Sequence, residues 1–214
     1  MKILGITGSI GMGKSTACQL LRQMGVPVHD ADATVHRLYG RKGAAVLPIS
    51  NRFPDAVKDG QVDRVALGRM VFGNKQALRD LEQIVHPLVQ AEERAFLARH
   101  RRRRTPVVAL DIPLLFESRG ERRCDAVAVV TAHALIQEQR VLARPGMTEE
   151  RLRLIRAKQM PDAEKRRRAD YIVPSGLGRG VTVRVLRRIV ADLTGRKDVC
   201  DHRSVFRTGR RRFH

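Results

Sequence analysis

The sequence predicts a single α/β domain in which helices cover both faces of a parallel β-sheet. Short apolar runs rich in Val and Ile alternate along the chain with segments of helical periodicity, which is typical of a parallel sheet with helical crossovers. The runs do not alternate between apolar and polar residues, so we expect both faces of each strand to be covered. A chain of 214 residues is long enough for such a three-layer α/β/α domain with a substantial core.

The candidate elements of this domain follow in order from the first residues. Residues 2–7 form a short, mostly apolar run bounded by glycine, which predicts a buried strand. Apolar residues at helical spacing over 14–24 predict a helix, and Gly25 is a typical residue to end it. Further strands are predicted at 26–29, 107–110, 126–130 and 171–173.

The segment between the second and third predicted strands has little strand character. It shows helical periodicity at 43–50, 62–72 and 75–100. We therefore expect a helical lobe over about residues 40–104, inserted into a core made of about 1–39 and 105–195. The polar and basic segment 196–214 is predicted to be a poorly ordered tail.

The composition points to an anionic ligand. Lys and Arg number 42 against 22 Asp and Glu, which gives a formal net charge of +20. Phosphates, nucleic acid or an anionic membrane surface would suit this charge. The chain has no apolar run long enough for a transmembrane helix, and we expect no membrane partner. Aromatic residues make up only 4%, with no Trp, which leaves few platforms for stacking on bases.

The cysteines and the start of the chain favour a cytoplasmic protein. Cys18, Cys124 and Cys200 are odd in number, widely separated and without metal-ligand spacing. They are expected to be thiols in a reducing compartment. The first residues lack the apolar region of a signal peptide. We expect a cytoplasmic monomer.

A phosphate-binding loop is the strongest single motif. Residues 8–15 fit the pattern G-x-x-x-x-G-K-[ST], directly after a predicted strand and at the start of a predicted helix. Such glycines let successive backbone N–H groups point at phosphate oxygens, and the helix N-terminus adds partial positive charge. Lys14 would reach the β- and γ-phosphates and Ser15 would join a Mg²⁺ shell. The alternative is a purely structural glycine turn that is capped by Ser15 and binds no ligand. The residues expected to hold the nucleotide here are Gly8, Gly11, Met12, Gly13, Lys14, Ser15 and Thr16.

The motif alone does not fix the reaction. A GTPase would read guanine with Asn-Lys-x-Asp, but residues 74–77 lack the final Asp. One P-loop with a helical insertion favours a nucleotide or metabolite kinase. Asp30 and Asp32 end the second predicted strand, where open α/β sheets bind ligands. Asp32 could orient an acceptor hydroxyl, or it could merely cap the helix expected at 33–39.

Two further groups of residues are candidates for phosphoryl transfer. Asp111 ends the third predicted strand, like a Walker B carboxylate that contacts Mg²⁺ directly or through water; the alternative is a cap or turn residue before Ile112-Pro113. Arg140 and Arg144 stand at i and i+4, which predicts one face of a helix beginning near His133. They could be lid arginines, as could arginines of the next helix, although a solvated face is the alternative for each. Those of the next helix are Arg151, Arg153 and Arg156.

The order and spacing of these residues resemble the dephospho-coenzyme A kinase family over nearly the whole chain, to about Asp192. Apart from the P-loop each segment is weak, but together they are specific. The matching segments are 5–16, 30–32, 81–89, 111–117, 139–144, 159–160 and 169–173.

The resemblance implies a P-loop fold with a helical lid over about 137–168 and transfer of the ATP γ-phosphate to the ribose 3′-hydroxyl of dephospho-CoA, with Mg²⁺. It implies that Asp32 is the catalytic base, that Lys14 and the P-loop hold the ATP phosphates, and that Arg140 acts from the lid. It also implies that the remaining matched positions lie on the substrate side or near the nucleotide: His86, Pro113 and Leu114 on the substrate side, and Arg144 with the nucleotide. Without the resemblance, His86 would be interpreted as a turn or cap residue.

Two positions depart from the family pattern. Met12 stands where a small serine is usual, and its side chain should point away from phosphate. The segment 173–178 lacks the Asn that many members carry near a glycine, so no adenine-specific residue is assigned. Two alternatives stay open: another P-loop kinase acting on a nucleoside monophosphate or small metabolite, and a nucleic-acid-binding protein that uses arginine clusters such as 101–104 and 165–168.

Overall fold

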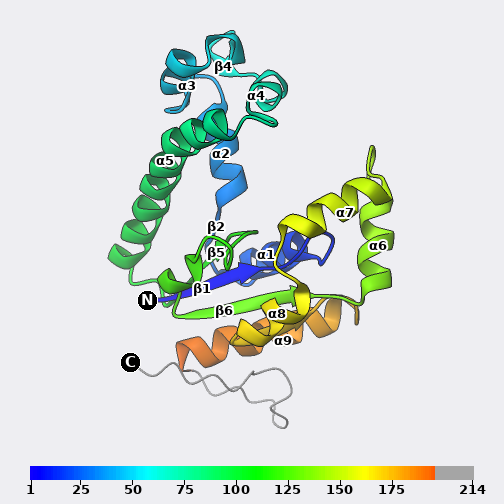
Figure 1. Cartoon of the computed structure of the whole chain (residues 1–214). Coiled ribbons are helices and arrows are strands. Elements are labelled where there is room, and N and C mark those ends of the chain that lie inside the picture. The colour runs from blue at the N-terminus through cyan, green and yellow to red at the C-terminus, as the bar shows by residue number, and fades with distance from the viewer. Residues whose placement is uncertain (196–214) are drawn as a thin grey trace. The chain divides into compact units, whose positions relative to one another are not determined.

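The computed structural model describes residues 1–195, which divide into two compact units (Figure 1). The first unit contains Met1–His29 and the chain from Arg104 onward, and the second contains Asp30–Arg103. The predicted basic tail lies outside the described residues. Within the described part of the chain, no helix is long and apolar enough to cross a membrane.

A five-stranded sheet forms the centre of the first unit. Its order is β2-β5-β1-β6-β7, and β1 pairs in parallel with both β5 and β6, as β6 does with β7. The sheet confirms the predicted α/β class and the predicted strands, with ends that differ by one or two residues. The strands are β1 (Lys2–Thr7), β2 (Val28–Asp30), β5 (Val107–Asp111), β6 (Ala126–Thr131) and β7 (Tyr171–Pro174).

The two faces of this sheet are covered by different elements. Helices α1 (Lys14–Gln23) and α9 (Arg179–Thr194) pack their buried Leu, Val and Ile side chains on the face to which Leu4 and Ile6 point, and Figure 1 shows α9 running along the strands. The opposite face is covered by the chain that follows β5, because a Cβ at Gly5 would meet Cys124 Sγ at 2.8 Å. This chain includes a 3-10 turn, η2 (Gly120–Arg123). Both faces of the sheet are therefore covered by protein, which explains why the strand sequences do not alternate between apolar and polar residues.

Three helices lie in the chain that connects β6 to β7. They are α6 (Ala134–Leu142), α7 (Glu149–Lys158) and α8 (Asp162–Arg168). Each begins where the sequence provides a suitable first turn: His133 and Thr148 accept backbone N–H groups as N-caps of α6 and α7, and Pro161 precedes α8. The lid expected over 137–168 would consist of these three helices, and its role as a lid stays a prediction.

The second unit is mainly helical and has a core of its own. Side-chain caps begin three of its helices: Asp30 for α2, Asp63 for α4 and Asn74 for α5. Its core includes Leu38 and Ile49. The elements are α2 (Ala31–Tyr39), α3 (Val46–Arg52), η1 (Pro54–Ala56), β3 (Val57–Lys58), β4 (Gln61–Val62), α4 (Arg64–Val71) and α5 (Lys75–Arg102).

One feature of this unit differs from the expected strand-free lobe. The strands β3 and β4 form a short antiparallel hairpin. Its two connecting residues, Asp59 and Gly60, both have positive φ (50° and 72°), as a two-residue hairpin turn requires. Two residues per strand are too few to show any periodicity in the sequence. The Asp-Gly pair was the available signal.

Candidate nucleotide-binding site

The P-loop connects β1 to α1 and has a backbone that only glycine accommodates at two positions. Gly11 and Gly13 have φ of 76° and 85°. A Cβ at Gly11 would lie 2.5 Å from Cγ2 of Val141. Gly13 is the N-cap residue of helix α1, and no side chain of the described residues caps this helix. The alternative in which Ser15 caps this turn is therefore wrong: Ser15 is exposed within the first turn of α1. The N-terminus of α1 is therefore available to an anion.

Three side chains from distant segments hold the P-loop in place. Gln137 Nε2 donates to the carbonyl of Ile10 at 2.7 Å, and the Ile10 N–H donates to Gln159 Oε1 at 3.1 Å. Ser175 Oγ donates to the carbonyl of Met12 at 2.7 Å. Sequence reasoning assigned no role to these three residues. The glutamine at position 137, on the buried side of an amphipathic helix, was the one local signal; the other two partners depend on the fold.

Met12 is accommodated beneath the loop. Its side chain is buried, and Sδ accepts the N–H of Ala132 at 3.1 Å, just after β6. A buried side chain bonded to the end of a strand is not among the groups that would contact phosphate. The departure from the usual small residue is thus a packing feature.

Lys14 and Asp111 form an ion pair at the centre of the site. Lys14 is the first residue of α1, and Asp111 is the last residue of β5, paired in register with Ile6 of β1. Their side chains are only 16% and 5% exposed. The structure therefore brings together two of the residues singled out from the sequence. Asp111 is neither a helix cap nor a turn residue, so that alternative is wrong.

The Cys18 thiol lies one helical turn beyond Lys14 and is also buried. Burial raises its pKa strongly, and the nearby Asp111 carboxylate, with which it hydrogen-bonds, adds to this rise. The thiol is therefore neutral at physiological pH and is not a nucleophile. It supports the Asp111 carboxylate from one side while Lys14 pairs with it.

Arg140 projects from α6 to the edge of the P-loop. Nη1 donates to Ser175 Oγ at 2.9 Å and Nη2 donates to the Ser175 carbonyl at 3.0 Å. A Cβ on Gly13 would lie 3.4 Å from Nη1, which shows how close the guanidinium is to the loop. Arg140 is exposed, so its charge is accessible to a phosphate.

The helix predicted to carry both Arg140 and Arg144 is shorter than expected. Helix α6 ends at Leu142, and Arg144 lies in the turn that follows. Pro145 disfavours helical torsions at the residue before it, and Gly146 then takes a φ of 70°. Arg144 therefore lies just outside the helix that carries Arg140.

The arginines of α7 either bind groups of the protein or face solvent. Arg156 Nη2 donates to Gln137 Oε1 at 2.8 Å, so it orients the glutamine that holds Ile10. Arg151 donates to the carbonyl of Gly146. Arg153 is exposed, in agreement with a solvated face.

The residues after β5 form a loop beside the P-loop strand. The carbonyl of Pro113 accepts the hydroxyl of Thr7 at 2.9 Å, and Thr7 directly precedes Gly8 of the P-loop. Leu114 is 44% exposed although it is apolar. The loop thus presents an apolar side chain to solvent from a backbone that is anchored to β1.

A magnesium ion would find suitable donors here. Ser15 offers a hydroxyl and Asp111 a carboxylate, and both are hard oxygen ligands of the type that Mg²⁺ prefers. No cluster of three or more His, Cys, Asp or Glu side chains occurs in residues 1–195.

In the second unit, Asp30 and not Asp32 caps helix α2. Asp30 Oδ1 accepts the N–H of Ala33 at 2.9 Å. Asp32 lies in the first turn with an exposed side chain, so the alternative in which Asp32 is the cap is wrong. His86 lies within α5 and is exposed, and the turn or cap interpretation is wrong there too.

Comparison with known proteins identifies what this chain is similar to. The CoaE family model, described as dephospho-CoA kinase, matches residues 2–176. The dephospho-CoA kinase of Paramagnetospirillum magneticum is 67% identical over 166 residues, or 78% of each chain. That of Mesorhizobium japonicum is 53% identical over 92% of this chain and 99% of the relative. A Thermus thermophilus crystal structure superposes with a TM-score of 0.79 at 38% identity, covering 91% of this chain and 98% of the other.

Proposed function

Because this chain belongs to the dephospho-CoA kinase family, we propose that it transfers the γ-phosphate of ATP to the ribose 3′-hydroxyl of dephospho-CoA, which yields CoA and ADP. This reaction would complete CoA biosynthesis. The observation that carries the proposal is the buried Lys14–Asp111 pair at a P-loop whose helix N-terminus has no side-chain cap among the described residues.

The P-loop would bind the ATP phosphates. Backbone N–H groups from Gly11 to Thr16 surround the anion, and Lys14 exchanges part of its contact with Asp111 for the β- and γ-phosphate oxygens. Arg140 stands beside the loop and would stabilise the charge that develops on the transferred group. Arg144 would contribute from the turn after α6.

Asp32 would act as the general base. In the transfer, the 3′-hydroxyl oxygen forms a bond to the γ-phosphorus, its proton passes to the Asp32 carboxylate, and the bond to the bridging oxygen of ADP breaks. Two features support this assignment: the carboxylate is exposed, and Asp30 takes over the capping of α2.

We propose that His86, Pro113 and Leu114 bind the acceptor. His86 presents an imidazole from α5, and Pro113 and Leu114 present the loop after β5. The exposed Leu114 suits an apolar or ring surface of the acceptor.

We propose that ATP is used with Mg²⁺, held by Ser15 and Asp111 on the protein side. A bound Mg²⁺ would neutralise part of the phosphate charge, with Ser15 and Asp111 as its protein ligands. We further propose that the protein is a monomer and that it is cytoplasmic; the reduced, buried thiols of Cys18 and Cys124 support the second point only.

The proposed function is tested by supplying purified protein with Mg-ATP and dephospho-CoA and detecting CoA by chromatography and mass. We expect equal amounts of CoA and ADP, and little ADP when AMP or shikimate replaces dephospho-CoA. ADP production with AMP or shikimate but none with dephospho-CoA would contradict the proposal and favour another P-loop kinase.

A further inference from the structure

Lys165 is the largest fully buried side chain of the described residues. It lies in α8 within a run of basic residues, yet its neighbours Arg166 and Arg167 are exposed. Its Nζ lies 3.0 Å from Glu117 Oε1 and 3.5 Å from the Pro113 carbonyl oxygen. A buried ammonium needs such partners, because taking an unpaired charge out of water is expensive.

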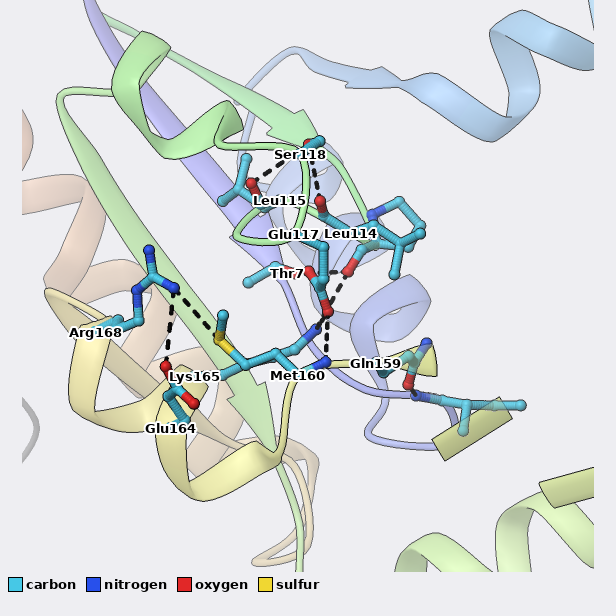
Figure 2. A network of polar contacts seen from close by, with 12 residues as sticks. Thr7, Leu114, Leu115, Glu117, Ser118, Gln159, Met160, Glu164, Lys165 and Arg168 are labelled. Atoms are coloured by element: carbon cyan, nitrogen blue, oxygen red, sulfur yellow. Dashed lines mark hydrogen bonds and ion pairs between the residues drawn. The ribbon is translucent and has the colours of Figure 1, made fainter. Parts of the chain in front are cut away.

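Glu117 joins this ammonium to a second segment. The oxygen that faces Lys165 also accepts the N–H of Met160 at 2.8 Å (Figure 2). Burial tends to raise the pKa of Glu117, but the bonds from Met160 and Lys165 together lower it below its usual value. Glu117 is thus a carboxylate at neutral pH, and one oxygen atom connects α8 to the chain that leaves α7.

Through Met160 and Pro113, the Lys165–Glu117 pair is linked to the P-loop and to the loop after β5. Gln159, next to Met160, accepts the N–H of Ile10 in the P-loop. Pro113, which faces Lys165, accepts the hydroxyl of Thr7 immediately before the P-loop. Figure 2 shows Met160 and Lys165 meeting at Glu117, with Thr7 close to them.

Helix α8 is itself fixed to the sheet. Thr131, the last residue of β6, donates its hydroxyl to Asp162 Oδ2 at 2.7 Å in the first turn of α8. At the other end of α8, the Arg168 guanidinium lies 4.8 Å from the centre of the Phe116 ring and donates to Glu121 Oε1 at 3.1 Å. Lys165 therefore extends from a rigid support.

Stability gives little reason for an ion pair at this position. Apolar side chains of similar volume usually replace a buried pair with no loss of stability, because desolvation offsets the attraction between the charges. What apolar residues cannot do is fix a carbonyl, a backbone N–H and a carboxylate at hydrogen-bond distances from one another.

We propose that Lys165 and Glu117 are positioning residues of the phosphoryl transfer: they set the loop carrying Pro113 and Leu114 at a fixed distance from the P-loop and from the returning end of α7. This proposal rests on the proposed function, because that function assigns the loop to the acceptor. A misplacement of about 1 Å between reacting groups can lower a rate by about 10²-fold.

The test is the double variant Glu117→Gln/Lys165→Met, with Arg167→Met on the exposed face of α8 as the matched control. We expect the double variant to melt within about 3 °C of the parent, since no unpaired charge is buried. Its kcat for CoA formation should fall at least about tenfold. The Kd of a non-hydrolysable ATP analogue should change less than threefold, and Arg167→Met should match the parent throughout.

Each other outcome is informative. A double variant that folds and keeps the parental kcat and acceptor KM would overturn the proposal, because the pair would then have no positioning role. A double variant that fails to fold would also overturn it, since the pair would then be needed for stability. The single variants should melt below the parent, because each leaves one buried charge without its partner. If the parent itself makes no CoA, the proposed function fails, and this is seen before any variant is compared.

Discussion

Arg140 donates hydrogen bonds to both oxygen atoms of Ser175, and the hydroxyl of Ser175 in turn donates to the P-loop carbonyl of Met12. A residue from the loop after β7 thereby joins the guanidinium of α6 to the backbone that surrounds the phosphates. Loss of one neutral hydrogen bond costs about 0.5–1.5 kcal/mol. Ser175 thus contributes to the nucleotide site even though the chain lacks the Asn that many members carry near this position.

Replacing Ser175 with Ala should weaken ATP binding. The substitution removes the hydroxyl that bonds Met12 and Arg140, so we expect the KM for ATP to rise about three- to tenfold while the KM for dephospho-CoA stays near the parental value. Thr194→Ala is a suitable control, because that hydroxyl bonds only carbonyls of its own helix in the described contacts. An unchanged KM for ATP would show that the loop keeps its shape without Ser175.

Replacing Asp32 with Asn should separate catalysis from capping. We expect kcat to fall by about 10² or more, because an amide cannot accept the hydroxyl proton. Binding of an ATP analogue should hold. The comparison is Asp30→Asn, since Asn is as good an N-cap as Asp and should leave the melting temperature nearly unchanged. Full activity of Asp32→Asn would remove Asp32 from the chemistry.

Replacing Lys14 with Met should lower kcat/KM for ATP by about 10²–10³, the scale seen when one positioned donor to a developing charge is lost. The same change deprives the buried Asp111 carboxylate of its partner, so some loss of thermal stability should accompany it. Lys2→Met is the control, because Lys2 is exposed and pairs loosely with Asp125 at 3.6 Å. The variants are compared by steady-state kinetics and thermal melting.

Replacing Asp111 with Asn should raise the Mg²⁺ concentration needed for half-maximal activity by several-fold, since a neutral amide is a weaker ligand for a hard cation. Excess EDTA should abolish the activity of the parent, and added Mg²⁺ should restore it. Asp55→Asn, in the short η1 turn of the second unit, should titrate like the parent. An Asp111→Asn protein with a parental Mg²⁺ titration would contradict a role for Asp111 in holding the metal.

Cys18 should resist alkylation in the folded protein. Burial and the adjacent Asp111 raise its pKa, so the reactive thiolate does not form even where an ordinary cysteine ionises, above about pH 8.5. We expect iodoacetamide to modify Cys18 at least about a hundredfold more slowly in the native protein at pH 9 than in guanidinium. The rate of Cys18 alkylation is measured by peptide mass spectrometry. Rapid native labelling would show that α1 opens readily.

The fold was largely predictable because its signals are local. Apolar runs and helical periodicity located all five strands of the sheet and helices α1, α4 and α5 to within a few residues, whereas the 16-residue helix α9 was not predicted. The β3–β4 hairpin was missed, since two residues a strand leave no period to detect. The helix expected to carry Arg140 and Arg144 together was too long, because the effect of Pro145 on its predecessor outweighs a spacing of four.

The site was predictable where a motif fixes the backbone, and not where distant segments meet. The P-loop follows from its own glycines, whereas the pairing of Lys14 with Asp111 depends on β1 and β5 being neighbours in the sheet, an order that the sequence did not predict. The bonds from Gln137, Gln159 and Ser175 to the loop join residues more than 120 positions apart, which no local pattern records.

By itself, the sequence determined the class of fold, the phosphate-binding loop and the family to which the chain belongs. Only the tertiary structure decided which polar atoms pair. It assigned the helix cap to Asp30 instead of Asp32, and it buried Lys165 while its basic neighbours stay in water. The physical reason is that periodicity specifies which face of an element is buried, whereas the partner of a buried charge comes from whichever segment the fold brings against that face.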